Sequence, residues 1–256
     1  MQLTHKPITL PILRSFEFKG ASAYFEAVVC RITAPRLEEL QIEPLEPRTF
    51  SVPGLAQFVD TTENLSFDDV LVMFKDKGID MVMSSRRDGN TRAVIVTVGC
   101  WQLDCQLYVM AQLSSALSQL FSALEHLIFG REVPSQSSEE YNDVDRMEWR
   151  NILRWFSGVK TLYVADASGL VEQFSQLLGL EDSPLELLPG LQMLAYSGSS
   201  DTDDTFTSFV DARQNAGRPV TLIRHSPMPG TSRPYSDDPG SAITTGSGEA
   251  RNDTDA

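Results

Sequence analysis

The chain has 256 residues, of which 41% are hydrophobic and 22% charged, and its formal net charge is −14. Such an acidic surface repels phosphate backbones and anionic lipid, so the composition disfavours nucleic-acid and membrane-surface roles. It is compatible with a basic or neutral protein partner. No window approaches the ~18 continuous apolar residues that a membrane-spanning helix needs.

The cysteine pattern and the N-terminus bear on the compartment. The three cysteines, Cys30, Cys100 and Cys105, contain no C-x-x-C pair, and an odd number is a poor disulfide framework. The first residues show no charged segment followed by an apolar run, so they do not resemble a signal peptide. We therefore expect reduced thiols and a cytoplasmic or nuclear protein.

In chain order, the first half is expected to begin with an extended segment and strand over residues 8–18. Helical spacing of apolar residues follows over 21–32, then a strand over 37–42 and a short helical turn over 54–61. Residues 64–74, 78–84 and 91–101 carry β-branched or alternating apolar residues, with turn chemistry at residues 88–90. The region 65–101 therefore forms either further regular repeats or a hairpin insertion.

The second half alternates helices with strands. Helices are predicted for residues 106–121, 145–156, 168–178 and 202–216, the last of them stopped by Gly217. The strands between and after them are expected at 124–129, 159–164, 191–196 and 220–223, and residues 134–145 form an exposed acidic loop. Residues 226–256 are Ser, Gly, Pro, Thr and Asp with almost no apolar content, which predicts a disordered tail.

One pattern, apolar-x-x-apolar-x-apolar, recurs five times in this chain. The copies begin at Leu13, Leu37, Leu124, Val159 and Leu191. This is the core of a leucine-rich repeat, whose short strand buries alternate side chains against neighbouring repeats. The fold class predicted is α/β: an irregular leucine-rich-repeat-like horseshoe solenoid over residues 1–225, with a parallel sheet and outer helices.

Longer phrases carry a resemblance to a family. The segments LRSFEFKGASAYFEAVVCRITAPRLEELQIE, FVDTTENLSFDDVLVMF and DARQNAGRPV, among others, resemble the leucine-rich-repeat part of F-box proteins expanded in mushroom-forming fungi. The similarity covers about residues 8–225. It implies a repeat scaffold that holds substrates for a cullin–RING ubiquitin ligase. No F-box precedes Ile8, which counts against a ligase adaptor as a partner of this chain.

Catalytic, cofactor and metal sites are not expected. His126 is the only central histidine, and no nucleophile motif such as G-x-S-x-G accompanies it. Cys100, Cys105 and His126 lack zinc-ligand spacing. The glycines near residues 240–248 follow no strand and open no helix, so they predict no phosphate loop. We therefore expect a protein that is not an enzyme and has no cofactor.

The predicted binding surface is the concave face of the repeats, where side chains flanking the buried strand positions point outward. The residues predicted to contact a protein partner are Glu17, Lys19, Glu39, Gln41, His126, Ile128, Thr161, Tyr163 and Met193. This surface grades from charged to more apolar along the chain. The function predicted is non-enzymatic protein binding, similar to substrate recognition in an F-box receptor. The alternative is a truncated structural or decoy relative that recruits no ligase.

Overall fold

The computed structural model describes residues 7–45, 53–62, 65, 67–87, 90–100, 102–121, 123–132, 143–165, 170–179, 187–197 and 206–225. By internal contacts the chain divides into two units, Met1–Ser226 and Pro227–Ala256. The fold is that of the first unit. The predicted tail and most of the predicted acidic loop lie outside the described residues, so both stay predictions.

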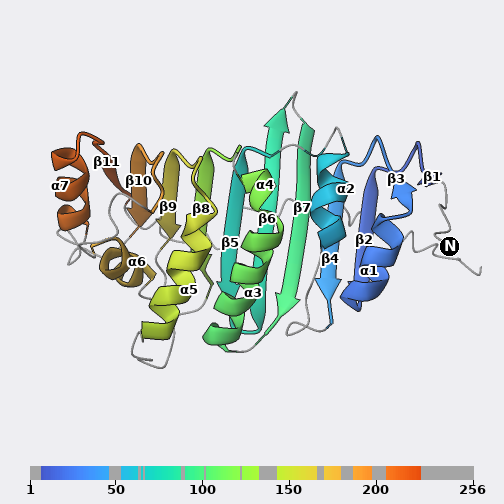
Figure 1. The fold of residues 1–256 in the computed structure, drawn as a ribbon, viewed down its shortest axis with the longest axis horizontal. Coiled ribbons are helices and arrows are strands. Elements are labelled where there is room, and N and C mark those ends of the chain that lie inside the picture. The colour runs from blue at the N-terminus through green and yellow to red at the C-terminus, as the bar shows by residue number, and fades with distance from the viewer. Residues whose placement is uncertain are drawn as a thin grey trace, which may run out of the picture. The chain divides into compact units, whose positions relative to one another are not determined.

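Nine strands form one sheet in the order β11–β10–β9–β8–β5–β6–β7–β4–β2 (Figure 1). Their bounds are β2 (Ser15–Gly20), β4 (Glu39–Pro44), β5 (Asp69–Lys75), β6 (Gly78–Arg87), β7 (Asn90–Gly99), β8 (His126–Arg131), β9 (Thr161–Ala165), β10 (Met193–Ser197) and β11 (Thr221–His225). A separate two-stranded parallel sheet pairs β1 (Ile8–Thr9) with β3 (Ile32–Thr33).

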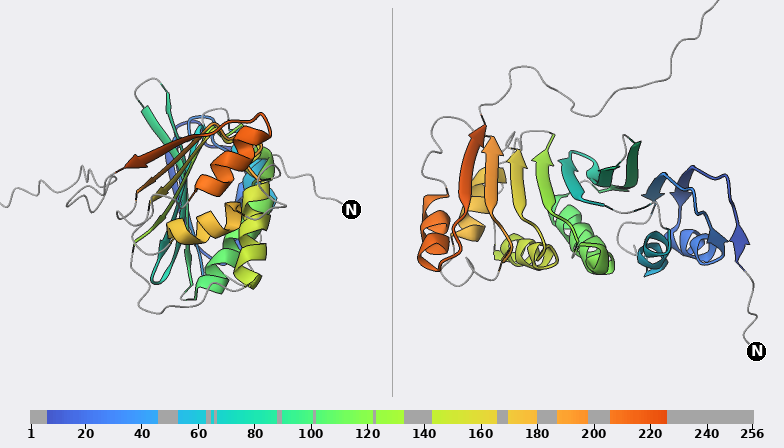
Figure 2. Two further views of the ribbon diagram at one scale, coloured as in Figure 1. Left: turned by 90° about the vertical axis from the view of Figure 1, so that its left-hand side faces the viewer. Right: turned by 90° about the horizontal axis from the view of Figure 1, so that it is seen from above.

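The helices cover one face of the large sheet, and no described helix covers the other (Figure 2). Their bounds are α1 (Ser22–Val29), α2 (Pro53–Asp60), α3 (Leu103–Ala116), α4 (Ser118–Phe121), α5 (Asp143–Arg154), α6 (Leu170–Leu178) and α7 (Thr207–Asn215). None of these helices is long and apolar enough to cross a membrane. We call the uncovered side the open face.

The predicted irregular horseshoe solenoid with a parallel sheet is wrong. β6 runs antiparallel to both β5 and β7 in the middle of the sheet. The chain also leaves β4 to place β5 three positions away, and then returns through β6 to lay β7 beside β4. The resulting sheet is mixed and flat (Figures 1 and 2). Of the two alternatives open for residues 65–101, the hairpin is the one observed.

Tight turns explain why this middle region reverses direction. Only Asp76 and Lys77 separate β5 from β6, and a two-residue connection can join only antiparallel strands. Gly78 then approaches β7 so closely that a Cβ atom on it would lie 2.4 Å from the Val98 carbonyl oxygen. Glycine is therefore the only residue that fits at this crossing without a backbone shift.

Other elements agree with the sequence to within a few residues. The helix predicted for residues 106–121 is two helices, α3 and α4, separated at Leu117. Gly217 stops α7 as predicted, with a φ of 72° that glycine adopts without steric cost. The predicted starts of the helices at residues 168 and 202 lie outside the described residues.

The core between sheet and helices is richest in aromatic rings beneath β5 and β8. Trp149 of α5 packs with its ring centroid 5.4 Å from Phe74, 5.3 Å from Phe129 and 4.8 Å from Phe174. All four side chains are at most 1% exposed. One tryptophan thus joins two strands and the neighbouring helix α6.

A carboxylate from α1 meets the N-terminus of α2. The backbone N–H of Gly54 donates to Glu26 Oε2 at 2.7 Å, which satisfies one of the free amides of the first helical turn. A Cβ atom at Gly54 would lie 2.5 Å from that oxygen, so the glycine makes room for the carboxylate. Burial raises the pKa of Glu26, and the backbone hydrogen bonds from Gly54 and Leu55 oppose this change only in part.

Replacing Glu26 by glutamine is expected to make unfolding less sensitive to pH. Because the pKa of Glu26 in the folded state lies above its ordinary value of 4.5, this group's contribution to stability falls as the pH rises through the folded pKa. Glutamine keeps the acceptor oxygen but has no charge to desolvate. Urea unfolding should therefore show Glu26→Gln gaining stability relative to the native protein as the pH rises above 4.5. Glu172→Gln, an exposed change on α6, should show no such trend.

Candidate functional site: the open face of the sheet

All nine predicted contact residues lie on the open face, in two separate groups. Alternation along the strands directs them away from the helices, and all of them are exposed or half-buried. Four of them lie on β2 and β4, where Glu17 pairs with Gln41, Lys19 pairs with Glu43, and Glu39 pairs with Ser15. The remaining five lie on β8, β9 and β10, where the register aligns His126 with Thr161 and Met193. Their role in binding stays a prediction.

The three strands between these groups join them through residues that the sequence reading did not select. Leu71 of β5, Val82 of β6 and Ile95 of β7 lie side by side in the register, and Leu71 also pairs with Ile128. Their alternation was visible in the sequence. The order of the strands was not, so their alignment with Ile128 was missed.

The result is one line of apolar side chains across seven adjacent strands, which we call the apolar row. It consists of Ile95, Val82, Leu71, Ile128, Tyr163, Ala195 and Ile223. Six of them are half-buried and Ala195 is buried, although no described helix covers this side. The row is therefore a contiguous apolar line that is partly accessible to solvent, and contiguous apolar patches are a feature of interaction sites in general.

Two side-chain contacts shape the surface at the apolar row. A Cβ atom on Gly130 would lie 2.5 Å from Met73 Sδ and 3.8 Å from the Cβ of Ala165, so the Met73 side chain occupies the space over the glycine. Nearby, the Tyr163 ring packs edge-on against the His225 ring with centroids 5.7 Å apart. The first contact places a methionine side chain beside the row, and the second places an imidazole ring there.

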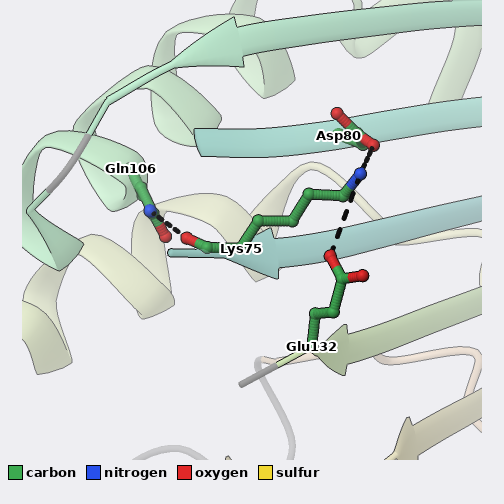
Figure 3. Close-up of polar contacts among 4 residues, drawn as sticks. All are labelled: Lys75, Asp80, Gln106 and Glu132. Carbon is green, nitrogen blue, oxygen red and sulfur yellow. Dashed lines mark hydrogen bonds and ion pairs between the residues drawn. The ribbon is translucent and has the colours of Figure 1, made fainter. Parts of the chain in front are cut away.

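A charged cluster borders the row at the end of β5 (Figure 3). Lys75 Nζ lies 2.5 Å from Asp80 Oδ2 and 4.0 Å from Glu132 Oε2. The buried Gln106 side chain holds this corner in place, because its Nε2 donates to the carbonyl oxygens of Lys75 at 2.7 Å and Cys100 at 3.0 Å. With two carboxylates to one ammonium group, the cluster is net acidic.

The edge of the open face at β4 and β2, next to the Ile95 end of the apolar row, is also acidic. β2 and β4 place Glu17, Glu39 and Glu43 there, with Lys19 as the only lysine of the two strands. Lys19 Nζ lies 2.5 Å from Glu43 Oε1, and the Ser15 hydroxyl donates to Glu39 at 3.3 Å. The apolar row is therefore bordered by negative charge on two sides.

Of the residues weighed for chemistry, His126 belongs to the open face, whereas Cys100 is buried. His126 is exposed on β8 between Asp69 and Thr161. Burial, followed by contact with the Cys105 thiol, raises the pKa of Cys100 to about 12, so this thiol is protonated at neutral pH. Within the described residues, no group of three or more His, Cys, Asp or Glu side chains could hold a metal ion.

The fold and the open face define a mixed α/β protein with helices on one side of its sheet and an apolar, acid-bordered surface on the other. No protein-family model, curated protein or solved structure gives a significant match to this chain. The resemblance to F-box proteins therefore stays a prediction from the sequence.

Proposed function

We propose that this protein binds another protein through the open face and catalyses no reaction. The observation that carries the proposal is the apolar row, which spans seven strands on the side of the sheet without described helices. Protein interfaces concentrate aromatic, Met and aliphatic contacts at their centre and polar groups at their rim. The open face has this arrangement, with Tyr163 in the row, Met73 beside it and carboxylates at its borders.

Charge selects the kind of partner. The borders contribute Glu17, Glu39 and Glu43 at one end and Asp80 and Glu132 at another. The chain as a whole carries a formal charge of −14. A partner with an apolar centre flanked by Lys or Arg side chains would be attracted by these carboxylates and by the negative charge of the whole chain. We therefore assign the open face to a basic-flanked apolar protein segment.

Two synthetic peptides with the same Leu- and Phe-containing centre test this assignment, one flanked by lysines and the other by glutamates. Fluorescence anisotropy should detect binding of the lysine-flanked peptide, weakened by added salt. The double variant Ile128→Ser/Tyr163→Ser should weaken it by about tenfold or more, because central apolar contacts dominate such interfaces.

Tyr108→Ser is the matched control, since Tyr108 is 44% exposed on α3 on the other side of the sheet. It should bind like the native protein. Equal binding of the two peptides would contradict the charge assignment. Full binding by the double variant, or no binding by the native protein, would contradict the use of this face.

The narrower role, substrate recognition for a ubiquitin ligase, rests on the resemblance alone. Affinity purification followed by mass spectrometry separates it from the decoy alternative. Ligase subunits recovered with the native protein would support the receptor role. A partner that is lost with Ile128→Ser/Tyr163→Ser, and arrives without ligase subunits, would support a binding module outside that system.

A further inference from the structure

The sheet ends at β2 with an incompletely covered core. The inward-facing Phe16 and Phe18 of β2 are only half-buried, whereas Leu40 and Ile42 at the matching positions of β4 are 0% and 1% exposed. Five of the eight large hydrophobic side chains exposed among the described residues belong to this end: Ile8, Ile12, Tyr24, Val28 and Leu45. β1, β3, α1 and β2 lie together there (Figure 1).

The backbone of β2 offers hydrogen bonds at the same edge. The Arg14 and Gly20 carbonyl oxygens, next to and at the two ends of β2, accept from Glu39 and Leu45 on the β4 side. Because backbone groups alternate in direction along a strand, those of Ser15, Glu17 and Lys19 point away from β4. Among the described residues β2 pairs only with β4, so this edge can accept a further strand.

The charges on β2 are complementary to themselves in one register. An antiparallel copy of β2 related by a twofold axis at Phe18 would place Glu17 opposite Lys19 of the other copy, and Lys19 opposite Glu17. Both residues have their backbone groups at the edge, so these would be hydrogen-bonded pairs with Phe18 facing its own copy. An axis at Glu17 would instead set glutamate against glutamate. An axis at Phe16 would leave Lys19 opposite Leu13.

We propose that the protein forms a twofold dimer through antiparallel pairing of β2 in the Phe18-centred register. The axis is perpendicular to the sheet, so both helix layers lie on one side and the α1 residues Tyr24 and Val28 of the two copies approach each other. The dimer joins the two sheets edge to edge. It uses the edge of the sheet and not the apolar row, so it stands or fails separately from the proposed function.

Charge reversal of full-length protein, followed by sedimentation velocity, tests both the dimer and its register. The native chain should sediment as a dimer of twice 28.4 kDa. Glu17→Lys and Lys19→Glu should each weaken association by about tenfold or more, because each sets like charges opposite one another twice. Mixing the two variants in equal amounts should restore a dimer, and so should the double variant Glu17→Lys/Lys19→Glu.

Lys160→Glu is the matched control for Lys19→Glu. Lys19→Glu also breaks the exposed Lys19–Glu43 ion pair, and Lys160→Glu breaks a similar exposed pair, Lys160–Glu125 at 2.5 Å, next to strands distant from β2. It should leave the dimer intact, and circular dichroism should show that every variant is folded. A native chain that stays monomeric at its highest soluble concentration would overturn the proposal. So would a dimer indifferent to both reversals, or single variants that fail to associate when mixed.

Discussion

Replacing Trp149 by alanine is expected to lower the free energy of unfolding by about 3–5 kcal/mol. The indole is 1% exposed and packs against Phe74 of β5, Phe129 of β8 and Phe174 of α6. Truncation removes buried apolar area and three edge-to-face ring contacts at once. It also leaves a cavity that two rigid strands and two helices cannot close. Urea unfolding followed by circular dichroism measures the loss.

Trp155→Ala is the control for this change. Trp155 follows α5 directly and is 37% exposed, so its truncation should cost less than about 1 kcal/mol. Trp149→Phe should fall between the two, because phenylalanine keeps part of the ring packing. Equal losses of stability for Trp149→Ala and Trp155→Ala would contradict the central place of Trp149 in the aromatic core.

Replacing Arg213 by alanine is expected to lower the free energy of unfolding by about 3 kcal/mol or more. The change removes a fully buried charged donor and leaves the carbonyl oxygens that it contacts without it. Arg213 Nη2 donates to the carbonyl oxygen of Leu191 at 3.0 Å, and to those of Leu188 and Pro189 at 3.4 Å. Its guanidinium carbon lies 5.8 Å from the centre of the Phe209 ring. Burial lowers the pKa of Arg213, and the charge of Arg218 adds to this effect.

The contacts of Arg213 hold a strained stretch of backbone. Leu188 has a φ of 51°, which is uncommon for a residue with a side chain of this size, and it precedes β10. Hydrogen exchange should therefore become faster at residues 187–192 in Arg213→Ala, besides the loss in urea stability. Arg213→Lys should lose less, because it keeps the charge without the planar fork. Arg154→Ala, at an exposed position, should change neither measurement.

The sequence predicts the strands and their outward residues well, and their directions poorly. The five repeat copies each end in an observed strand, because the burial of alternate residues is encoded locally. Parallel and antiparallel strands share that alternation, so Val70, Val72 and Phe74 do not reveal that β6 reverses. The short connection at Asp76 and Lys77 was the available signal.

The buried polar groups were also beyond reach of the sequence. Arg213 lies in DARQNAGRPV, one of the segments that carry the family resemblance, yet the segment alone cannot show whether its arginines are buried. Gln106 was assigned to a helix only by the apolar residues around it. Its two carbonyl partners, Lys75 and Cys100, become neighbours only after β5 and β7 have both been placed.

The shortest ladder of the large sheet lies where β7 pairs with β4. β4 and β7 are joined over four residue pairs, from Glu39–Ala93 to Ile42–Val96, fewer than any other neighbouring pair in the large sheet. β2 reaches the rest of the sheet only across this ladder. Subglobal unfolding can therefore release β2 and β4 as one cooperative unit, while the hairpins of β5, β6 and β7 and the strands beyond them stay folded.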